Sequence, residues 1–283
     1  MKVGVVLEGG ASRTIFSCGV TDAWLEEGFM PDYFIGVSAG IAYGVSYLSG
    51  QKGRNWEIAE KYMWDKRYMG MHHLRKSKNF YNVGLVFRDI PNHLLPFDYE
   101  AFEKFPGEVE AAVTDIRTGK AQYLPVPRNK NMMPILIASC ALPVLFQPVT
   151  IRHRQYLDGG IADSIPYQHA FEKGCDKVIV VLTRPRDYEK KTEKALYFSN
   201  FIYQKYPKMV ESMTTRPQRY NQCTSELERL EKEGKVFVIA PEDTYGIGRT
   251  EGKPEILKPL YEEGYYMMKE RMVKLRKYLE QPL

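Results

Sequence analysis

Cysteine and histidine are scarce in this chain, and each scarcity excludes a class of protein. The four cysteines among 283 residues lie far apart and form no CxxC pair. We therefore expect reduced thiols in a cytoplasmic protein rather than a disulfide scaffold. The five histidines show no metal-ligand spacing, so the sequence predicts neither a metal site nor another cofactor.

Long apolar runs and strong charge are also missing. No run reaches the roughly 18 apolar residues that span a bilayer. The N-terminal sequence MKVGVVLEGG has a short apolar stretch that ends at Glu8, unlike a secretory signal peptide. The net charge of +5 is too small for a nucleic-acid-binding arm. It fits either an ordinary solvated surface or peripheral contact with an anionic membrane, and nothing indicates the oligomeric state.

The composition that is present predicts a folded α/β protein. The chain is 44% hydrophobic and 27% charged, which suits a sizeable core. Short Val- and Ile-rich runs without polar alternation predict strands buried on both faces of a mostly parallel sheet. The predicted strands are 2–7, 33–37, 109–114, 121–124, 177–182 and 235–240. Helix-like stretches between them predict right-handed crossovers in one α/β domain.

Prolines shape the helix predictions. Helices are predicted at 15–27, 39–50, 55–67, 165–173 and 255–280. Residues 191–233 are expected to form two or three helices broken near Pro207 and Pro217. Three prolines in the apolar segment 134–149 predict loop and turn there.

One serine lies where a buried strand turns sharply into a helix. Residues 33–42 read YFIGVSAGIA, so Ser38 stands at the centre of a GxSxG turn. In that context the motif is typical of a nucleophile held in a strained backbone, and Gly36 and Gly40 avoid clashes in the tight turn. The following helix N-terminus favours negative charge. The alternative is that Ser38 only caps the helix.

A glycine-containing loop follows the first strand. It reads EGGASR over residues 8–13, so Gly9 and Gly10 leave backbone N–H groups unobstructed toward a ligand. A nucleotide-phosphate loop is the competing interpretation, but neither GxxxxGK[ST] nor GxGxxG occurs. The loop is therefore better interpreted as the oxyanion hole that a nucleophilic serine needs.

The candidate base is an aspartate. Residues 156–160 read YLDGG and place Asp158 before two glycines, although Asp-Gly alone is a common turn. His153 lies in a charged string and His169 inside a predicted helix. A Ser-His-Asp triad is thus the weaker alternative.

The combination EGGASR, GVSAG and DGG, in this order, resembles the patatin-like phospholipases, particularly the bacterial group. The segment ASCALPVLFQPV at 138–149 looks like that family's AS-x-A-x-P…F-x-P element, and TDIRTG at 114–119 is similar to its TD-x-x-TG. Ser164 stands where asparagine is usual after DGG. The resemblance runs from residue 3 to about residue 185.

The resemblance implies a fold and a set of site residues. It implies a single patatin-like three-layer α/β/α domain over 1–283, with a motif-bearing core to about 185 and a mainly helical part from 186. Ser38 would be the nucleophile and Asp158 the base of a dyad without histidine. The oxyanion hole would comprise Gly9, Gly10, Ala11, Arg13 and Ala39, and the motif glycines would be Gly36, Gly40, Gly159 and Gly160.

The oxyanion loop departs from the family pattern twice. Ala11 replaces a third glycine and Thr14 replaces the last one. If the third position needs a positive φ, alanine costs about 1 kcal/mol there. These departures leave the shape of the oxyanion hole as a question for the structure.

The implied function is a serine acyl hydrolase that cleaves carboxylic esters of lipids through an acyl-enzyme. The lipid would be a phospholipid, lysophospholipid or acylglycerol. Two alternatives stay open, an acyltransferase with the same dyad and a non-catalytic lipid-binding or regulatory protein. Apolar residues near the motifs would hold an acyl chain or belong to the core, and these are Ile15, Phe16, Ile41, Leu142, Val144, Leu145 and Phe146. The basic stretch 66–78 either contacts a membrane or belongs to the solvated surface. The last helix has an apolar stripe that either contacts a membrane or packs on the core, formed by Met268, Met272, Leu275 and Leu279.

Overall fold

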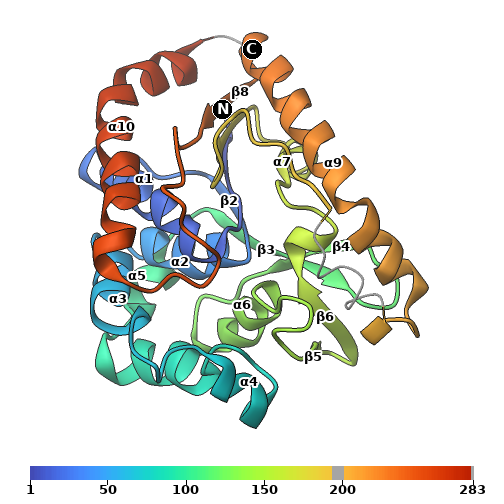
Figure 1. The fold of residues 1–283 in the computed structure, drawn as a ribbon. Coiled ribbons are helices and arrows are strands. Elements are labelled where there is room, and N and C mark those ends of the chain that lie inside the picture. Colours follow the sequence, from blue (N-terminus) through green and yellow to red (C-terminus); the bar gives the residue numbers. More distant parts are fainter. Residues whose placement is uncertain (193–200, 282–283) are drawn as a thin grey trace.

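The computed structural model describes residues 1–192 and 201–281, which fold around one eight-stranded sheet (Figure 1). The order is β5-β6-β3-β2-β1-β7-β8, and β4 also pairs with β3. The parallel strands are β1 (Val3–Leu7), β2 (Tyr33–Val37), β3 (Glu108–Asp115), β7 (Lys177–Val181) and β8 (Val236–Ile239). The antiparallel ones are β4 (Ala121–Pro125), β5 (Val149–Ile151) and β6 (Arg154–Asp158).

Helices cover both faces of this sheet and give the expected three layers (Figure 1). Alternate residues of β1 point to opposite faces, so Val5 joins one core cluster and Val6 the other. The Val5 side packs against α1 (Ile15–Glu26), α2 (Ala39–Leu48) and α10 (Pro254–Glu280). The Val6 side packs against α7 (Tyr167–Glu172) and α9 (Pro207–Lys232).

Shorter helical segments complete the fold. The α-helices are α3 (Arg54–Ile58), α4 (Met71–Ser77), α5 (Tyr99–Lys104) and α6 (Met133–Ser139). Two π-helical segments, η2 (Ala59–Met63) and η3 (Leu85–Leu94), and three 3-10 turns, η1 (Ala11–Thr14), η4 (Lys130–Met132) and η5 (Gly159–Ile161), complete the set.

All six predicted strands are present. Two of the proline-based predictions are wrong in part: residues 140–148 do form turns and loop, and a helix does begin at Pro207. Pro134 lies in the first turn of α6, where a helix N–H has no intrahelical acceptor and proline is tolerated. Pro217 lies inside α9, which continues for 26 residues without a break. That helix forgoes one hydrogen bond, and the buried residues Met209, Tyr220 and Leu227 hold it to the body of the protein on both sides of the proline. Residues 193–200, part of the same prediction, lie outside the described residues.

The last helix docks on the core. Met268, Met272 and Leu275 of α10 are buried. Of the two alternatives for this apolar stripe, membrane contact or core packing, the structure shows core packing, against α1. Within the described residues, no helix combines the length and the hydrophobicity that crossing a bilayer requires.

Candidate active site

The central strand β3 aligns the ends of two other strands. Val37, the last residue of β2, pairs with Ala112, and Asp158, the last residue of β6, pairs with Val113. Because β4 occupies the other edge of β3, β2 and β6 approach each other end to end along one edge. This pairing brings Ser38 and Asp158 to the same place, although 120 positions separate them.

The backbone of Ser38 is strained in the way that the GxSxG turn predicts. Its φ is 54° and its ψ is −127°, a combination that costs a non-glycine residue about 1–3 kcal/mol. The turn is tight enough to need glycine on both sides. A Cβ on Gly36 would lie 2.5 Å from the backbone nitrogen of Ile41, and one on Gly40 would lie 2.5 Å from the carbonyl oxygen of Leu7.

A buried serine that the sequence analysis did not single out holds this turn. The Ser38 N–H donates to the Ser139 hydroxyl at 2.9 Å, and that hydroxyl donates to the Ala112 carbonyl at 2.7 Å. Ser139 is fully buried. The only signal for it was its place in the quoted AS-x-A-x-P segment, which does not reveal a partner.

Asp158 is a buried carboxyl with one oxygen open. Its Oδ1 accepts the Gly160 N–H at 2.8 Å, whereas its Oδ2 has no hydrogen bond to any described residue. Burial raises the pKa of Asp158, and the nearby Ser38 hydroxyl, the Arg216 charge and the Gly160 N–H oppose that rise. The Ser38–Asp158 contact is therefore looser than a formed hydrogen bond, as is common in unliganded sites.

The loop after β1 lies directly against the nucleophile turn. A Cβ on Gly9 would stand 2.7 Å from the Ser38 Cβ. Among the described residues, nothing accepts a hydrogen bond from the N–H groups of Gly10, Ala11 and Ala39. Three backbone donors near Ser38 are thus available to a ligand oxygen.

The two departures in the loop have different consequences. Ala11 has a φ of 49°, so the position does require the left-handed region, and alanine carries a cost of about 1 kcal/mol there. Thr14 has a φ of −63°, which any residue adopts. The loop reaches the conformation that a glycine would allow, and only Ala11 is strained.

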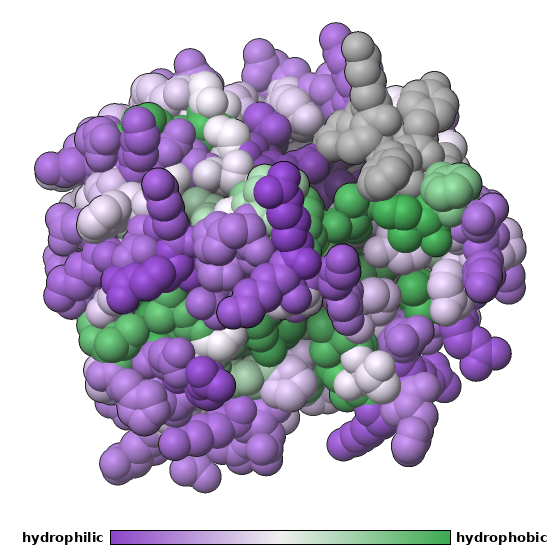
Figure 2. All heavy atoms as spheres, turned by 60° about the horizontal axis from the view of Figure 1, so that its bottom comes forward, coloured by the Kyte–Doolittle hydropathy of each residue, from purple (hydrophilic) through white to green (hydrophobic). Residues whose placement is uncertain are grey.

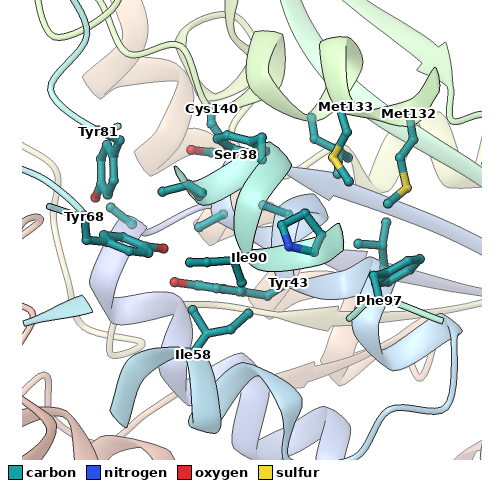
Figure 3. A pocket seen from close by; sticks show the side chains of 18 of the residues that line it. Ser38, Tyr43, Ile58, Tyr68, Tyr81, Ile90, Phe97, Met132, Met133 and Cys140 are labelled. Atoms are coloured by element: carbon teal, nitrogen blue, oxygen red, sulfur yellow. The ribbon is translucent and has the colours of Figure 1, made fainter. Parts of the chain in front are cut away.

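An apolar cavity of about 110 Å³ opens from Ser38 (Figure 3). In Figure 3, Ser38 and Cys140 lie close together, with Tyr68 and Tyr81 on one side of them and Met132, Met133 and Phe97 on the other. Of the predicted acyl-binding residues, Leu142 and Phe146 line this cavity. Ile15, Phe16 and Ile41 are instead buried in the core between the helices and the sheet, the alternative that the sequence left open for them. Neither Val144 nor Leu145 lines the cavity.

A polar cavity of about 40 Å³ lies on the other side of Ser38 and includes Asp158. Ser38, Ala11 and Leu142 line both cavities. The polar one is also lined by five basic residues, Arg13, Arg184, Lys190, Arg216 and Arg249. In the described part of the chain, no histidine lines either cavity. Except for Arg13, these basic residues come from segments without a motif, so the sequence offered no signal for them.

Comparisons with known proteins show relatives of low identity. The chain is 24% identical over 198 residues to the Escherichia coli protein "Uncharacterized protein YjjU", covering 65% of this chain and 52% of that one. It is 25% identical to "Lysophospholipase NTE1" of Eremothecium gossypii over 63% of this chain and 12% of that one. It is 26% identical to mouse "1-acylglycerol-3-phosphate O-acyltransferase Pnpla3" over 47% of this chain and 32% of that one. The aligned region thus spans about half of the first relative and less of the others.

Two family models match different parts of the chain. One, a domain of unknown function (DUF6363), matches residues 206–280, which include α9, β8 and α10. The other matches residues 5–171, more than half of the chain, and includes the GxSxG turn, the loop after β1 and the Asp-Gly-Gly turn. That second model describes the patatin-like phospholipases, and the chain belongs to this family.

Proposed function

We propose that this protein hydrolyses carboxylic esters of lipids, with Ser38 as nucleophile and Asp158 as base. One observation carries the proposal. A strained serine stands at the mouth of an apolar cavity beside a buried carboxyl whose Oδ2 has no hydrogen-bond partner among the described residues. An open acceptor of this kind suits a group that must take a proton.

The chemistry follows from these positions. Asp158 accepts the proton of the Ser38 hydroxyl while Oγ bonds to the ester carbonyl carbon. The carbonyl oxygen becomes negative and accepts hydrogen bonds from the N–H groups of Gly10, Ala11 and Ala39. The C–O bond to the alcohol then breaks, and Asp158 returns the proton to the leaving oxygen. Water, deprotonated by Asp158, releases the fatty acid by the same steps.

Burial makes the aspartate fit for this task. An exposed aspartate, with a pKa of about 3.9, is a weak base toward a hydroxyl. Burial raises the pKa of Asp158 because the charged form loses solvation. Proton uptake from Ser38 neutralises the buried charge and is favoured for the same reason.

The experiment compares ester hydrolysis by three variants over a series of acyl chain lengths. Ser38→Ala should abolish turnover, and Asp158→Asn should reduce kcat about 10²–10⁴-fold, as loss of a general base does. The matched control is Asp163→Asn, because Asp163 is also largely buried with a raised pKa but binds the Tyr123 hydroxyl and lines neither cavity at Ser38. Equal loss in both aspartate variants, or turnover by Ser38→Ala, would contradict the proposal.

An acyltransferase with the same dyad is the second candidate, since one relative is named as an acyltransferase and another as a lysophospholipase. The two activities differ only in whether an alcohol or water attacks the acyl-enzyme. Adding glycerol 3-phosphate to the hydrolysis assay separates them. Acylated acceptor at the expense of free fatty acid would identify a transferase, and unchanged fatty acid release would identify a hydrolase.

Contact with a lipid surface would bring the substrate to the site. Figure 2 shows hydrophobic residues reaching the surface between hydrophilic ones, in a view that brings the bottom of Figure 1 forward. In that part, α4 exposes Met71 beside Arg75 and Lys76. In a vesicle sedimentation assay, the protein should bind anionic vesicles, and Met71→Asp should weaken this binding. If the variant binds as well as the wild type, α4 does not contact the membrane.

A further inference from the structure

Three polar side chains lie in the wall of the mostly apolar cavity at Ser38, and the proposed reaction uses none of them. They are Tyr43 of α2, Arg54 at the start of α3, and Tyr68 in the turn after η2. Arg54 and Tyr68 are buried and Tyr43 is half-buried. An acyl chain that fills this cavity therefore meets a guanidinium and two hydroxyls as well as hydrocarbon.

Arg54 is a buried cation that has donors to spare. Only 7% of its surface is exposed. Its Nη1 donates to the Ser46 hydroxyl at 3.2 Å and its Nη2 to the Leu95 carbonyl at 2.9 Å, whereas its Nε has no partner among the described residues. A guanidinium carries five N–H donors, so these two hydrogen bonds leave donors for a ligand.

The groups that hold Arg54 are neutral. Besides the two hydrogen bonds, its guanidinium carbon lies 5.5 Å from the ring centroid of Phe97. The carboxylate whose charge acts on Arg54, that of Glu57, is half-exposed and forms an ion pair with Lys61. Burial lowers the pKa of Arg54 to about 10, so the side chain is still a cation at neutral pH. A buried cation held by neutral partners is costly, and an anion in the cavity would offset that cost.

The two tyrosine hydroxyls lie together in the same cavity. In Figure 3, the hydroxyls of Tyr43 and Tyr68 point toward each other. The Tyr43 hydroxyl donates to the sulfur of Met63 at 3.5 Å, and a thioether is a weak acceptor. Burial raises the pKa of both tyrosines, and the Arg54 charge opposes that rise at Tyr68. Both hydroxyls are therefore protonated donors, and the guanidinium acts on the same part of the cavity.

We infer that the acyl group of the substrate carries a carboxylate, which Arg54 binds inside the apolar cavity together with the hydroxyls of Tyr43 and Tyr68. The inference rests on the proposed function and names the substrate class as half-esters of dicarboxylic acids. A carboxylate accepts several hydrogen bonds and matches the planar fork of a guanidinium. The methylene groups between the two carboxyl carbons would contact the apolar lining, with the ester carbonyl at Ser38.

This arrangement discriminates against a plain hydrocarbon chain of the same length. A methyl-ended chain would fill the cavity but leave the donors of Arg54 and the two tyrosines without an acceptor. Buried donors that a ligand leaves unpaired reduce its binding and its turnover. A carboxamide has the shape of a carboxylate without its charge, so it should fall between the two.

The first test measures kcat/KM for p-nitrophenyl esters whose acyl chains end in a carboxylate, a carboxamide or a methyl group. The carboxylate series runs from adipate to dodecanedioate, each with partners of equal chain length, and uncatalysed hydrolysis is subtracted. At the best length, the wild type should favour the carboxylate over the methyl end at least about tenfold, or ~1.4 kcal/mol. If no length shows a preference for the carboxylate, the inference is wrong and the proposed hydrolase stands.

Substitution of Arg54 separates recognition of the carboxylate from folding. Arg54→Gln should lower the ratio of kcat/KM for the carboxylate-ended ester to that for the methyl-ended ester about tenfold. Arg128→Gln is the matched control and should leave the ratio unchanged. Arg128 likewise donates to two backbone carbonyls and lies over an aromatic ring, that of Phe105, but it lines neither cavity at Ser38. An unchanged ratio in Arg54→Gln, whatever the absolute rates, would overturn the inference.

A second variant covers the case in which Arg54→Gln does not fold. Tyr68→Phe removes one hydroxyl and keeps the ring, so it should lower the same ratio about three- to tenfold. Tyr62→Phe is its control, because the Tyr62 hydroxyl donates to the Leu94 carbonyl and does not line the cavity. The inference is wrong if Tyr68→Phe and Tyr62→Phe both keep the wild-type ratio.

Binding to the Ser38→Ala protein tests the inference without turnover. Calorimetry should show the monoethyl ester of the best dicarboxylic acid binding more tightly than the ethyl alkanoate of equal length, and Arg54→Gln should remove the difference. The free alkanoate of that length is the probe for a fatty acid that enters the cavity with its carboxylate first. If the free alkanoate binds as tightly as the monoethyl ester, the cavity is a fatty-acid site and the inference is wrong. Equal binding of the two ethyl esters also overturns it, whether or not the wild type hydrolyses esters.

Discussion

Replacing Ser139 with alanine removes two hydrogen bonds that hold the nucleophile turn. The Ser38 N–H loses its acceptor at 2.9 Å, and the Ala112 carbonyl loses its donor at 2.7 Å. Both groups lie in the interior, and Ser139 is fully buried. Neither therefore gains a water molecule in exchange unless the site opens.

The expected magnitudes follow from these contacts. A buried polar group left without a partner costs about 1–3 kcal/mol, so two such groups predict a loss of ~2–6 kcal/mol in the free energy of unfolding. The backbone strain at Ser38 stores about 1–3 kcal/mol. Without its hydrogen bond the turn relaxes, and restoring the reactive geometry should slow acylation of Ser38 roughly 10–100-fold.

Two assays on the Ser139→Ala protein separate stability from reactivity. Urea unfolding gives the first quantity, and the rate of labelling by an alkyl fluorophosphonate, well below the unfolding midpoint, gives the second. The matched control is Ser49→Ala, because Ser49 is buried and its hydroxyl donates to the Ser46 carbonyl, outside the turn. The control should lose about 1 kcal/mol and label at the wild-type rate. Labelling of Ser139→Ala at the wild-type rate would refute the view that this hydroxyl positions the nucleophile.

Three further predictions follow from the charge and shape of the site. Asp158→Asn should raise Tm by about 2–4 °C at pH 7, because burial raises the pKa of Asp158 and the ionised carboxyl opposes folding. The gain in Tm should vanish below about pH 3.9, where the carboxyl is protonated in both the folded and the unfolded state. Calorimetry at a series of pH values measures Tm, and no gain at pH 7 would contradict this prediction. Arg216→Gln should shift the acid limb of the kcat/KM profile to higher pH, since the Arg216 charge lowers the pKa of Asp158, and an unmoved or lower limb contradicts this. Ala42→Trp should fill the apolar cavity, so that kcat/KM for a long-chain ester falls about 100-fold relative to an acetate ester, unless the acyl chain lies elsewhere.

Much of the fold was predictable because its strands are buried on both faces. The five-residue strands β1, β2 and β7 are buried along their whole length, and apart from Lys177 at the start of β7 they contain no charged residue. β6 was missed because it begins with exposed Arg154 and Gln155, so its pattern resembles a loop. Pairing with β3 makes it a strand, and that contact is not encoded in local sequence.

The residues of the candidate site were likewise predictable only in part. Ser38 and the glycines around it act through local backbone geometry, which the GVSAG pattern encodes. For Ile15 and Phe16 the sequence left acyl binding and core open, and the structure places both in the core, because closeness in sequence to a motif does not decide which way a helix turns its side chains. Two arginines of the polar cavity, Arg216 and Arg249, come from α9 and from the loop before α10, and only the folded chain brings them to Ser38.

The most direct test of the central claim is peptide mapping by mass spectrometry after reaction with a long-chain alkyl fluorophosphonate. We predict a single adduct on the peptide that contains Ser38, and slow formation of the same adduct in Asp158→Asn. An adduct on a different residue, or one that persists in Ser38→Ala, would contradict the account.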